Sequence, residues 1–200
     1  KVVKKLDTKK YKIVPGTNDD FIVDNLQKGK IIGRCVGRME FGQRALGNRS
    51  ILADPRNILI KEKINAAIKN RDFWMPFAPI ILNKISNEYI ENPKKLESPF
   101  MTIGFKTTKK GYENMIAASH IADKSARPQI LNQEDNSKLY NLINKFYEKT
   151  GCGALLNTSF NLHGYPIVNT PQDAIYVFEN SDLDILILNN FMILKNDEKN

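Results

Sequence analysis

Residues 136–164, NSKLYNLINKFYEKTGCGALLNTSFNLHG, join a helix pattern directly to a strand pattern. Apolar residues recur there at helical spacing and would share one face, which comprises Leu139, Leu142, Ile143 and Phe146. Gly151 stands where a helix C-cap belongs, and residues 153–157 (GALLN) are then typical of a buried strand that ends in a polar loop. The stretch predicts a helix followed by a strand, the unit from which α/β proteins are built.

The same alternation continues outward in both directions. Helix patterns cover residues 19–29, 57–71 and 169–180, the last with Thr170 as N-cap and Pro171 at the first helical position, and shorter ones cover 85–91 and 111–120. Strand patterns cover 30–37, 50–54, 76–82, 99–105 and 126–131, and residues 183–195 predict a hairpin over Asn189-Asn190. We therefore expect an α/β (α+β mixed) fold with a mixed sheet, formed by one domain over residues 19–200 after a lysine-rich linker or arm over residues 1–18.

Composition indicates a soluble globular protein that attracts anions. The chain of 200 residues is 42% hydrophobic and 26% charged, with a formal net charge of +8. No apolar run approaches the roughly 20 residues that span a bilayer, and the basic start has no apolar core like that of a signal peptide. We expect a cytoplasmic protein without membrane contact, whose Cys35 and Cys152 are buried free thiols, and the start at Lys1 suggests a piece of a longer chain.

The positive charge is unevenly distributed between lysine and arginine. The chain has 23 lysines and seven arginines, and six of the arginines lie between residues 34 and 71: Arg34, Arg38, Arg44, Arg49, Arg56 and Arg71. Residues 37–56, GRMEFGQRALGNRSILADPR, combine four of them with glycines at 37, 42 and 47, which let backbone approach a ligand. Arginine differs from lysine in its planar, two-pronged recognition of phosphate and carboxylate. The cluster thus indicates an anionic ligand, although Arg44 and Arg49 could instead pair with Glu40 and Asp54.

Two further stretches carry polar residues in settings suited to a ligand. Lys69 and Arg71 end a helix beside Phe73 and Trp74, where they could form a second cationic wall or merely complement the helix dipole. Asn157 and Ser159, with Asn161 just beyond, end a buried strand, where open α/β sheets bind ligands, although turn formation would also explain them. Two histidines without acidic or thiol companions at ligand spacing predict no metal site.

Four motifs in order resemble the C-terminal domain of the O-carbamoyltransferases, the enzymes of antibiotic and nodulation-factor tailoring. They are residues 37–56, quoted above, KNRDFWMPFAP (69–79), HIADKSARPQ (120–129) and GALLNTSFNLHGYPIVNTPQDAI (153–175). The resemblance implies a YrdC-like twisted mixed sheet flanked by helices, with a basic cleft that binds carbamoyl phosphate and ATP with Mg²⁺ and forms carbamoyl adenylate. It also implies a separate N-terminal, Kae1-like (actin-like ATPase) domain that holds iron or another divalent metal and passes the carbamoyl group to a substrate hydroxyl.

Site residues follow from this resemblance by motif position. It implies that Arg44 and Arg49 hold phosphate oxygens, with Lys69 and Arg127 lining the same site. It further implies that Asn157 and Ser159, with Asn161 beyond them, contact the carbamoyl group or the nucleotide phosphate, and that Arg38 and Arg71 are neighbours. Two positions depart from the family pattern: Met75 replaces an arginine common before PFAP, and Gln43 replaces a common proline.

Two other functions stay open at this point. A YrdC-like fold with a basic cleft can bind double-stranded RNA, although arginines in glycine-rich turns speak against a nucleic-acid ligand. Threonylcarbamoyl-adenylate synthesis from bicarbonate and threonine is the related alternative. A homodimer also stays open, and the acceptor would bind the N-terminal domain.

Overall fold

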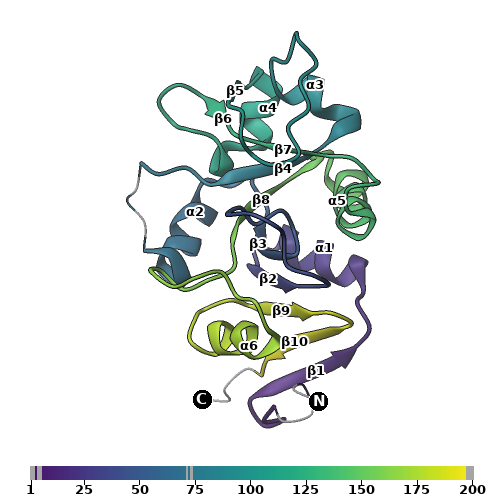
Figure 1. The fold of residues 1–200 in the computed structure, drawn as a ribbon, viewed down its shortest axis with the longest axis vertical. Helices are drawn as coiled ribbons and strands as arrows, with labels where there is room; N and C mark the ends of the chain where they lie inside the picture. The colour runs from purple at the N-terminus through teal and green to yellow at the C-terminus, as the bar shows by residue number, and fades with distance from the viewer. Residues whose placement is uncertain (1–2, 4–5, 71, 73, 197–200) are drawn as a thin grey trace.

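A mixed sheet of eight strands organises the molecule (Figure 1). The computed structural model describes residues 3, 6–70, 72 and 74–196. The strand order is β1-β10-β9-β2-β3-β8-β4-β7, in which β2/β9 and β4/β7 are parallel and the other neighbours antiparallel. The strands are β1 (Tyr11–Pro15), β2 (Ile32–Cys35), β3 (Arg49–Ala53), β4 (Ala78–Leu82), β7 (Gln129–Leu131), β8 (Ala154–Ser159), β9 (Ile185–Leu188) and β10 (Phe191–Lys195).

Helices cover both faces of this sheet because its strands bury both sets of alternating side chains. One apolar core holds Leu52 and Ile187 together with α1 (Asp19–Gln27) and α5 (Ser137–Thr150). The other holds Ile51 and Leu186 together with α2 (Leu59–Ile64) and α6 (Pro171–Glu179). Beyond β4 and β7 lies a smaller layer, at the top of Figure 1, made of β5 (Phe105–Lys106), β6 (Ser125–Ala126), α3 (Ser86–Tyr89), α4 (Lys109–Asn114) and the 3-10 turns Asn83–Ile85 and Ile116–Ala118. In the part of the chain that the structure describes, no helix has the length and apolar character of a membrane span.

The expected mixed α/β class is confirmed, and so are its best-marked elements. Helix α5 ends at Gly151 with φ 73°, and α6 starts with the capping box between Thr170 and Asp173. Asn189, at φ 51°, forms the turn of the β9–β10 hairpin with Asn190. Strand order and the parallel β2/β9 pair lie beyond what these local patterns predict.

Two predicted segments differ from the structure. The sequence predicts a linker or arm over residues 1–18, but Tyr11–Pro15 within this stretch forms strand β1 and pairs with β10 at the sheet edge, where Pro15 is tolerated. Residues 99–105 were predicted to be a strand, but only Phe105 enters one, β5. Met101 has φ 54°, a left-handed conformation that interrupts an extended strand.

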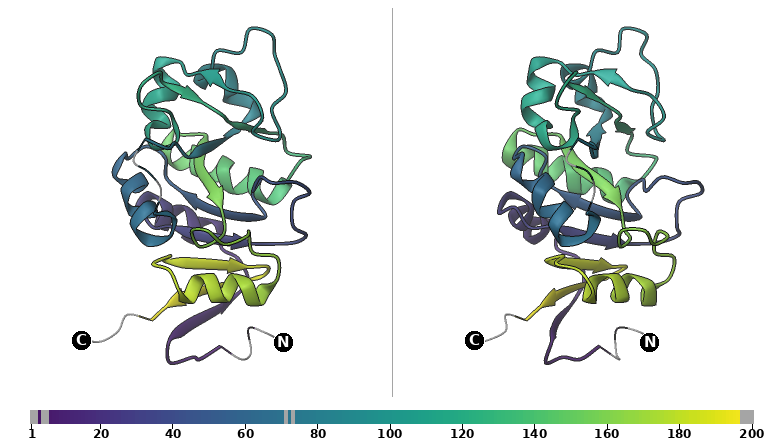
Figure 2. Two further views of the ribbon diagram at one scale, coloured as in Figure 1. Left: turned by 60° about the vertical axis from the view of Figure 1, so that its left-hand side comes forward. Right: turned by 90° about the vertical axis from the view of Figure 1, so that its left-hand side faces the viewer.

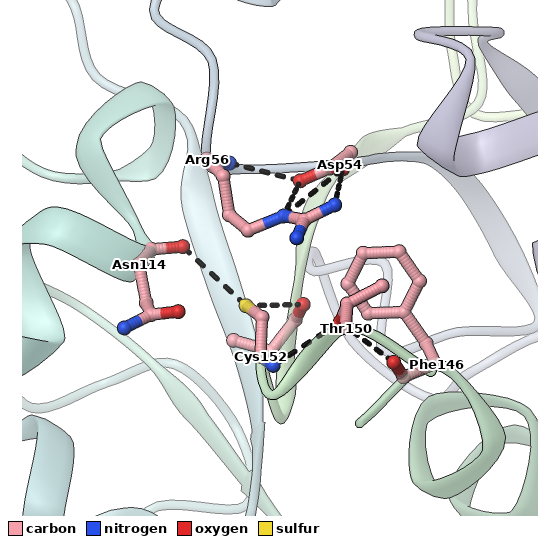
Figure 3. Close-up of polar contacts among 7 residues, drawn as sticks. Asp54, Arg56, Asn114, Phe146, Thr150 and Cys152 are labelled. Carbon is pink, nitrogen blue, oxygen red and sulfur yellow. Dashed lines mark hydrogen bonds and ion pairs between the residues drawn. The ribbon is translucent and has the colours of Figure 1, made fainter. Parts of the chain in front are cut away.

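Arg56 lies in a polar cluster with Asp54, near Cys152 in the turn between α5 and β8 (Figure 3). The guanidinium of Arg56 binds both carboxylate oxygens of Asp54, at 2.6 Å from Nη2 to Oδ2 and 2.9 Å from Nε to Oδ1, and lies 5.3 Å from the Phe146 ring centroid. Nearby, the buried thiol of Cys152 lies 3.5 Å from the carbonyl oxygens of Asn114 and Ala154. Both cysteines are buried and free, as predicted.

The ends of five strands lie together at one edge of the main sheet. Strands β2 and β8 end at this edge, while β3, β4 and β7 begin there. Residues 36–48 connect β2 to β3 and project beyond the strands, as the two views of Figure 2 show. The arginine-rich loop, the polar loop after β8 and the segment before β7 therefore meet without being neighbours in sequence.

Candidate functional site

A cavity of about 830 Å³ opens at this edge of the sheet. Among the described residues, three cationic side chains line it: Arg44 from the loop before β3, Lys69 from the end of the α2 segment and Arg127 from the segment before β7. The structure thus brings together three of the four residues that the resemblance places around the phosphate, all but Arg49. They converge because β3, β8, β4 and β7 are sheet neighbours whose relevant ends lie on one edge.

Lys69 reaches the cavity from an unusual stretch of helix. Residues Asn65–Lys69 continue α2 as a π-helical turn, which ends at Asn70 in the left-handed conformation (φ 44°, ψ 42°). Such π turns often mark functional sites because they re-aim the side chains that follow. Lys69 is 2% exposed, and its Nζ donates to the carbonyl oxygen (2.6 Å) and Oγ (3.2 Å) of Ser159 and to the carbonyl oxygen (3.1 Å) and Oδ1 (2.7 Å) of Asn161.

Ser159 and Asn161 are held rigidly around this ammonium. Ser159 Oγ donates to Asn161 Oδ1 at 2.6 Å, and Asn161 Nδ2 donates to the carbonyl oxygens of Leu162 (2.9 Å) and Tyr165 (2.7 Å). These contacts fix which end of the Asn161 amide faces Lys69. The loop after β8 and the end of the π-helical turn therefore form one polar network, and Lys69 and Asn161 both line the cavity.

Arg44 and Arg127 differ from Lys69 in their exposure and in their hydrogen-bond partners. Both are exposed, and neither guanidinium has a hydrogen bond or ion pair with any residue that the structure describes. Partial burial, and then the like charge of Arg44, lower the pKa of the Arg127 guanidinium. Two arginines that border one cavity and have no ion pair among the described residues form a site in which a doubly charged phosphate would be stabilised.

Arg49 does not line the cavity, contrary to the place that the family motif implied for it. It is 5% exposed, and its guanidinium donates to the carbonyl oxygens of Val36 (3.1 Å), Gly37 (3.0 Å), Asn48 (3.1 Å) and Asn169 (3.1 Å). Both Nη groups are thus used on backbone carbonyls, whereas Nε is buried without a partner among the described residues. Arg49 anchors the loop that presents Arg44.

Glu40 and Arg34 complete the support of this loop. Glu40 Oε1 accepts from the backbone N–H of Leu46 (2.7 Å), Asn48 (2.7 Å) and Arg49 (3.2 Å). Arg34, also buried, donates from Nη1 to the carbonyl oxygen of Gly47, and burial lowers the pKa of its guanidinium to about 10. Arg34 is therefore structural, and Glu40, which the sequence suggested as an alternative partner of the arginines, binds backbone instead.

The remaining predicted residues divide into three groups. Arg38 is exposed on the same loop and does not line the cavity. Arg71 lies outside the described residues, as does Phe73. Asn157 lines a smaller pocket of about 90 Å³ next to the main cavity, and Arg44 and Arg127 border both spaces.

Sequence reasoning missed several residues of the cavity wall. His120, Asp123, His163 and Asp72 all line it, and His120 Nδ1 lies 3.1 Å from Asp123 Oδ1. Hydrogen bonds from Ser125 are the main cause that lowers the pKa of Asp123. The signal was available, because His120 opens the same motif that contains Arg127. Met75 also lines the cavity, so the position where relatives often carry arginine does face the site.

Comparisons with known proteins connect this geometry to a family. The family model described as "Carbamoyltransferase C-terminus" matches residues 23–195. Nodulation protein NolNO of Sinorhizobium fredii is 42% identical over 84% of this chain and 25% of its own length. A 3'-hydroxymethylcephem-O-carbamoyltransferase of Amycolatopsis lactamdurans is 30% identical over 82% of this chain and 30% of its own length. The Methanocaldococcus jannaschii protein MJ1051 is 43% identical over 91% of this chain and 34% of its own length. The chain thus spans about a quarter to a third of the length of these relatives.

Solved structures support the fold. The phosphate- and nucleotide-bound form of full-length HypF matches with a TM-score of 0.58 at 11% identity, covering 93% of this chain and 22% of that protein. HypF of T. kodakarensis matches with a TM-score of 0.55 at 13% identity, covering 93% and 23%. At such identities the likeness shows a shared fold only.

Proposed function

The chain belongs to the carbamoyltransferase C-terminal family, and we propose that it binds carbamoyl phosphate and MgATP in the cavity and forms carbamoyl adenylate. The observation that carries the proposal is the gathering of Arg44, Lys69 and Arg127 in one space of about 830 Å³. A cavity of this size falls in the range of pockets that bind ligands as large as nucleotides. Three cations in it suit the phosphates of both substrates.

Arg44 and Arg127 would hold the transferred or leaving phosphates. Because neither has a partner among the described residues, an anion between them would remove their mutual repulsion and gain charge-assisted hydrogen bonds. Arginine suits this position because a phosphate can take two parallel N–H donors from one planar group. Catalysis of phosphoryl and nucleotidyl transfer is mostly positioning and charge neutralisation, which this pair can supply.

Lys69 and the loop after β8 would orient the reacting groups. The atom balance of adenylate formation requires water to release carbamate and phosphate from carbamoyl phosphate. A carbamate oxygen then bonds to the α-phosphorus of ATP as the bond to the departing pyrophosphate breaks. Lys69 Nζ already lies against four oxygen atoms of Ser159 and Asn161, so its charge is held at a fixed point beside this path.

Magnesium would arrive on the nucleotide. Asp72 and Asp123 line the cavity, but no three acidic, histidine or cysteine side chains of the described residues are grouped so as to hold a metal ion. Two carboxylates are enough to contact a Mg²⁺ ion that keeps water and phosphate oxygens as its other ligands. The ion would supply neutralisation of the triphosphate charge.

The acceptor hydroxyl would bind elsewhere in a longer protein. The chain covers only 25–34% of the relatives named above, which leaves room for a further domain of the same polypeptide. We propose that this N-terminal part, of the Kae1-like kind with its own metal, transfers the carbamoyl group. Cytoplasmic supply of ATP and carbamoyl phosphate fits this assignment, as do the two buried free thiols.

Calorimetric titration tests the proposal. The chain is titrated with carbamoyl phosphate, MgATP, duplex RNA, and threonine with bicarbonate, each at two salt concentrations. We expect carbamoyl phosphate and MgATP to bind and the other ligands not to. Tight RNA binding that weakens steeply with salt, without a response to carbamoyl phosphate, would establish a nucleic-acid-binding module instead. Binding of threonine with bicarbonate and ATP would indicate threonylcarbamoyl-adenylate synthesis.

A further inference from the structure

The pocket next to the main cavity is built for a small group. Its volume is about 90 Å³, and Ala45, Met101 and Asn157 line it together with Arg44 and Arg127. The pocket has about a ninth of the volume of the main cavity, so it suits a small group better than a nucleoside. Its two arginines are shared with the main cavity, so a phosphate held by them would direct its substituent into the pocket.

Asn157 contributes a polar atom that has no partner. The residue is 2% exposed, and its Nδ2 donates to the carbonyl oxygen of Ala45 at 2.8 Å. This bond fixes the orientation of the amide, because the reversed amide would set two oxygens against each other. Oδ1 is then left buried, with no hydrogen-bond donor among the described residues. A buried acceptor without a donor costs free energy, which a ligand N–H would recover.

We propose that this pocket is the subsite of the carbamoyl group and that Asn157 Oδ1 accepts a hydrogen bond from the carbamoyl NH₂. The inference rests on the proposed function and adds to it the basis of substrate choice. Acetyl phosphate presents a methyl group where carbamoyl phosphate presents NH₂, and it would leave Oδ1 unsatisfied. Sites that hydrogen-bond a substrate N–H or O–H reject analogues that lack it far more strongly than apolar pockets reject a methyl group.

Met101 lies next to Asn157, and its displacement would let a ligand reach the buried Oδ1 atom. Its sulfur lies 4.0 Å from Asn157 Nδ2, and the residue lines both the small pocket and the outer hollow next to Phe41 and Phe100. A methionine side chain adjusts to irregular spaces at little cost, so it can move aside for a small planar group. Arg44 and Arg127 also line the outer hollow and would keep the phosphate in place.

Gln129 offers a matched comparison within the same sheet. Its Nε2 donates to the carbonyl oxygen of Leu46 at 3.3 Å, its Oε1 is buried without a partner among the described residues, and it is 4% exposed. Both side chains therefore anchor the arginine-rich loop and leave an acceptor free. Gln129, however, lines neither the main cavity nor the small pocket. Substitutions of Asn157 and Gln129 therefore distinguish a role in recognising the ligand from a role in anchoring the loop.

Two phosphonates that differ only in the recognised group test the inference by calorimetry. Phosphonoacetamide keeps the NH₂ group, whereas acetonylphosphonate has methyl in its place. We expect the wild-type chain to bind phosphonoacetamide at least tenfold more tightly, Asn157→Leu to reduce this preference to less than threefold, and Gln129→Met to retain it. Thermal unfolding of each variant confirms that it is folded.

The outcomes separate the two proposals. Equal affinity of wild-type protein for both phosphonates would overturn the carbamoyl subsite while leaving a phosphate-binding cavity, and this comparison needs no variant. An unchanged preference in folded Asn157→Leu would overturn the role of its Oδ1. Failure of both phosphonates, carbamoyl phosphate and MgATP to bind would overturn the proposed function itself and the inference with it.

Discussion

The ammonium of Lys69 donates to the carbonyl oxygen of Ser159 at 2.6 Å and so joins the end of a π-helical turn to the end of β8. The two residues are 90 positions apart in the chain. This contact ties the helix end to the strand end beside the cavity, which Lys69 and Asn161 both line. Loss of the contact should therefore affect both stability and ligand binding.

Lys69→Met should lower the free energy of unfolding by about 1–3 kcal/mol, because buried oxygens of Ser159 and Asn161 lose their donor. It should also weaken binding of MgATP and carbamoyl phosphate at least tenfold. Urea denaturation and calorimetry measure the two effects. Lys61→Met is the control, since Lys61 is a buried lysine of α2 that does not line the cavity. Equal effects of both substitutions on ligand binding would contradict a specific role of Lys69.

Arg44→Lys and Arg127→Lys should each weaken carbamoyl phosphate binding at least tenfold, or about 1.4 kcal/mol, while keeping the charge. The reason is that an ammonium cannot offer two parallel donors to one phosphate. Arg38 lies on the same loop but outside the cavity. The Arg38→Lys variant should therefore bind carbamoyl phosphate with an affinity within threefold of wild type. Calorimetric titration compares the three variants, and undiminished affinity in both cavity variants would exclude these arginines as the phosphate clamp.

Arg49→Lys should act on stability instead. Lysine cannot span the four carbonyl oxygens that Arg49 binds, so we expect a loss of about 2 kcal/mol in the free energy of unfolding. Arg38→Lys, an exposed substitution, should change it by less than about 0.5 kcal/mol. Urea denaturation measures the free energy of unfolding of both variants. Full stability combined with lost phosphate binding would return Arg49 to the ligand site that its motif implied.

The contrast between Arg44 and Arg49 shows how much of the candidate site can be predicted from the sequence. Arginine enrichment and motif order pointed to Arg44, Lys69 and Arg127, and in the structure these three residues line one cavity. Both arginines stand in the same loop motif, and only the direction of the side chain at the start of β3 sends Arg49 to the backbone. That direction depends on strand register, which local patterns do not fix. His120 was missed because its companion Asp123 forms a turn contact with no metal-ligand spacing.

The fold was predictable to a similar degree. Helices with clear caps, such as α5 and α6, follow from local chemistry. The edge strand Tyr11–Pro15 does not, because it is stabilised by pairing with β10, about 180 residues later in the chain. Long-range pairing likewise decides that β9 lies beside β2 in parallel. Sequence patterns thus indicated the class, and the sheet order came from contacts that they do not contain.

Gly47→Ala should destabilise the protein by about 2 kcal/mol or more. Gly47 has φ 113°, and an added Cβ would lie 2.3 Å from Leu139 Cδ2 in α5, so backbone strain and overpacking combine. Gly42→Ala is the control for strain alone, because Gly42 has φ 122° but open space around its Cα. Thermal and urea denaturation of both variants separate the contribution of backbone strain from that of overpacking against Leu139. Equal losses would show that packing of the loop on α5 contributes nothing.

Alkaline pH should reveal the burial of Cys152. Burial raises the pKa of its thiol to about 11 from 9.0, so between these values the unfolded chain ionises while the folded protein stays neutral. The folded state then binds more protons than the unfolded state, and stability must fall as the pH rises from about 9 towards 11. Cys152→Ala lacks this contribution, so its free energy of unfolding should fall less steeply, by on the order of 2 kcal/mol across the window. Urea denaturation at pH 8, 9 and 10 measures the difference in the free energy of unfolding between wild type and Cys152→Ala. The contributions of the other titrating groups cancel in this difference. A difference that does not change with pH would mean that the thiol ionises equally in the folded and unfolded states.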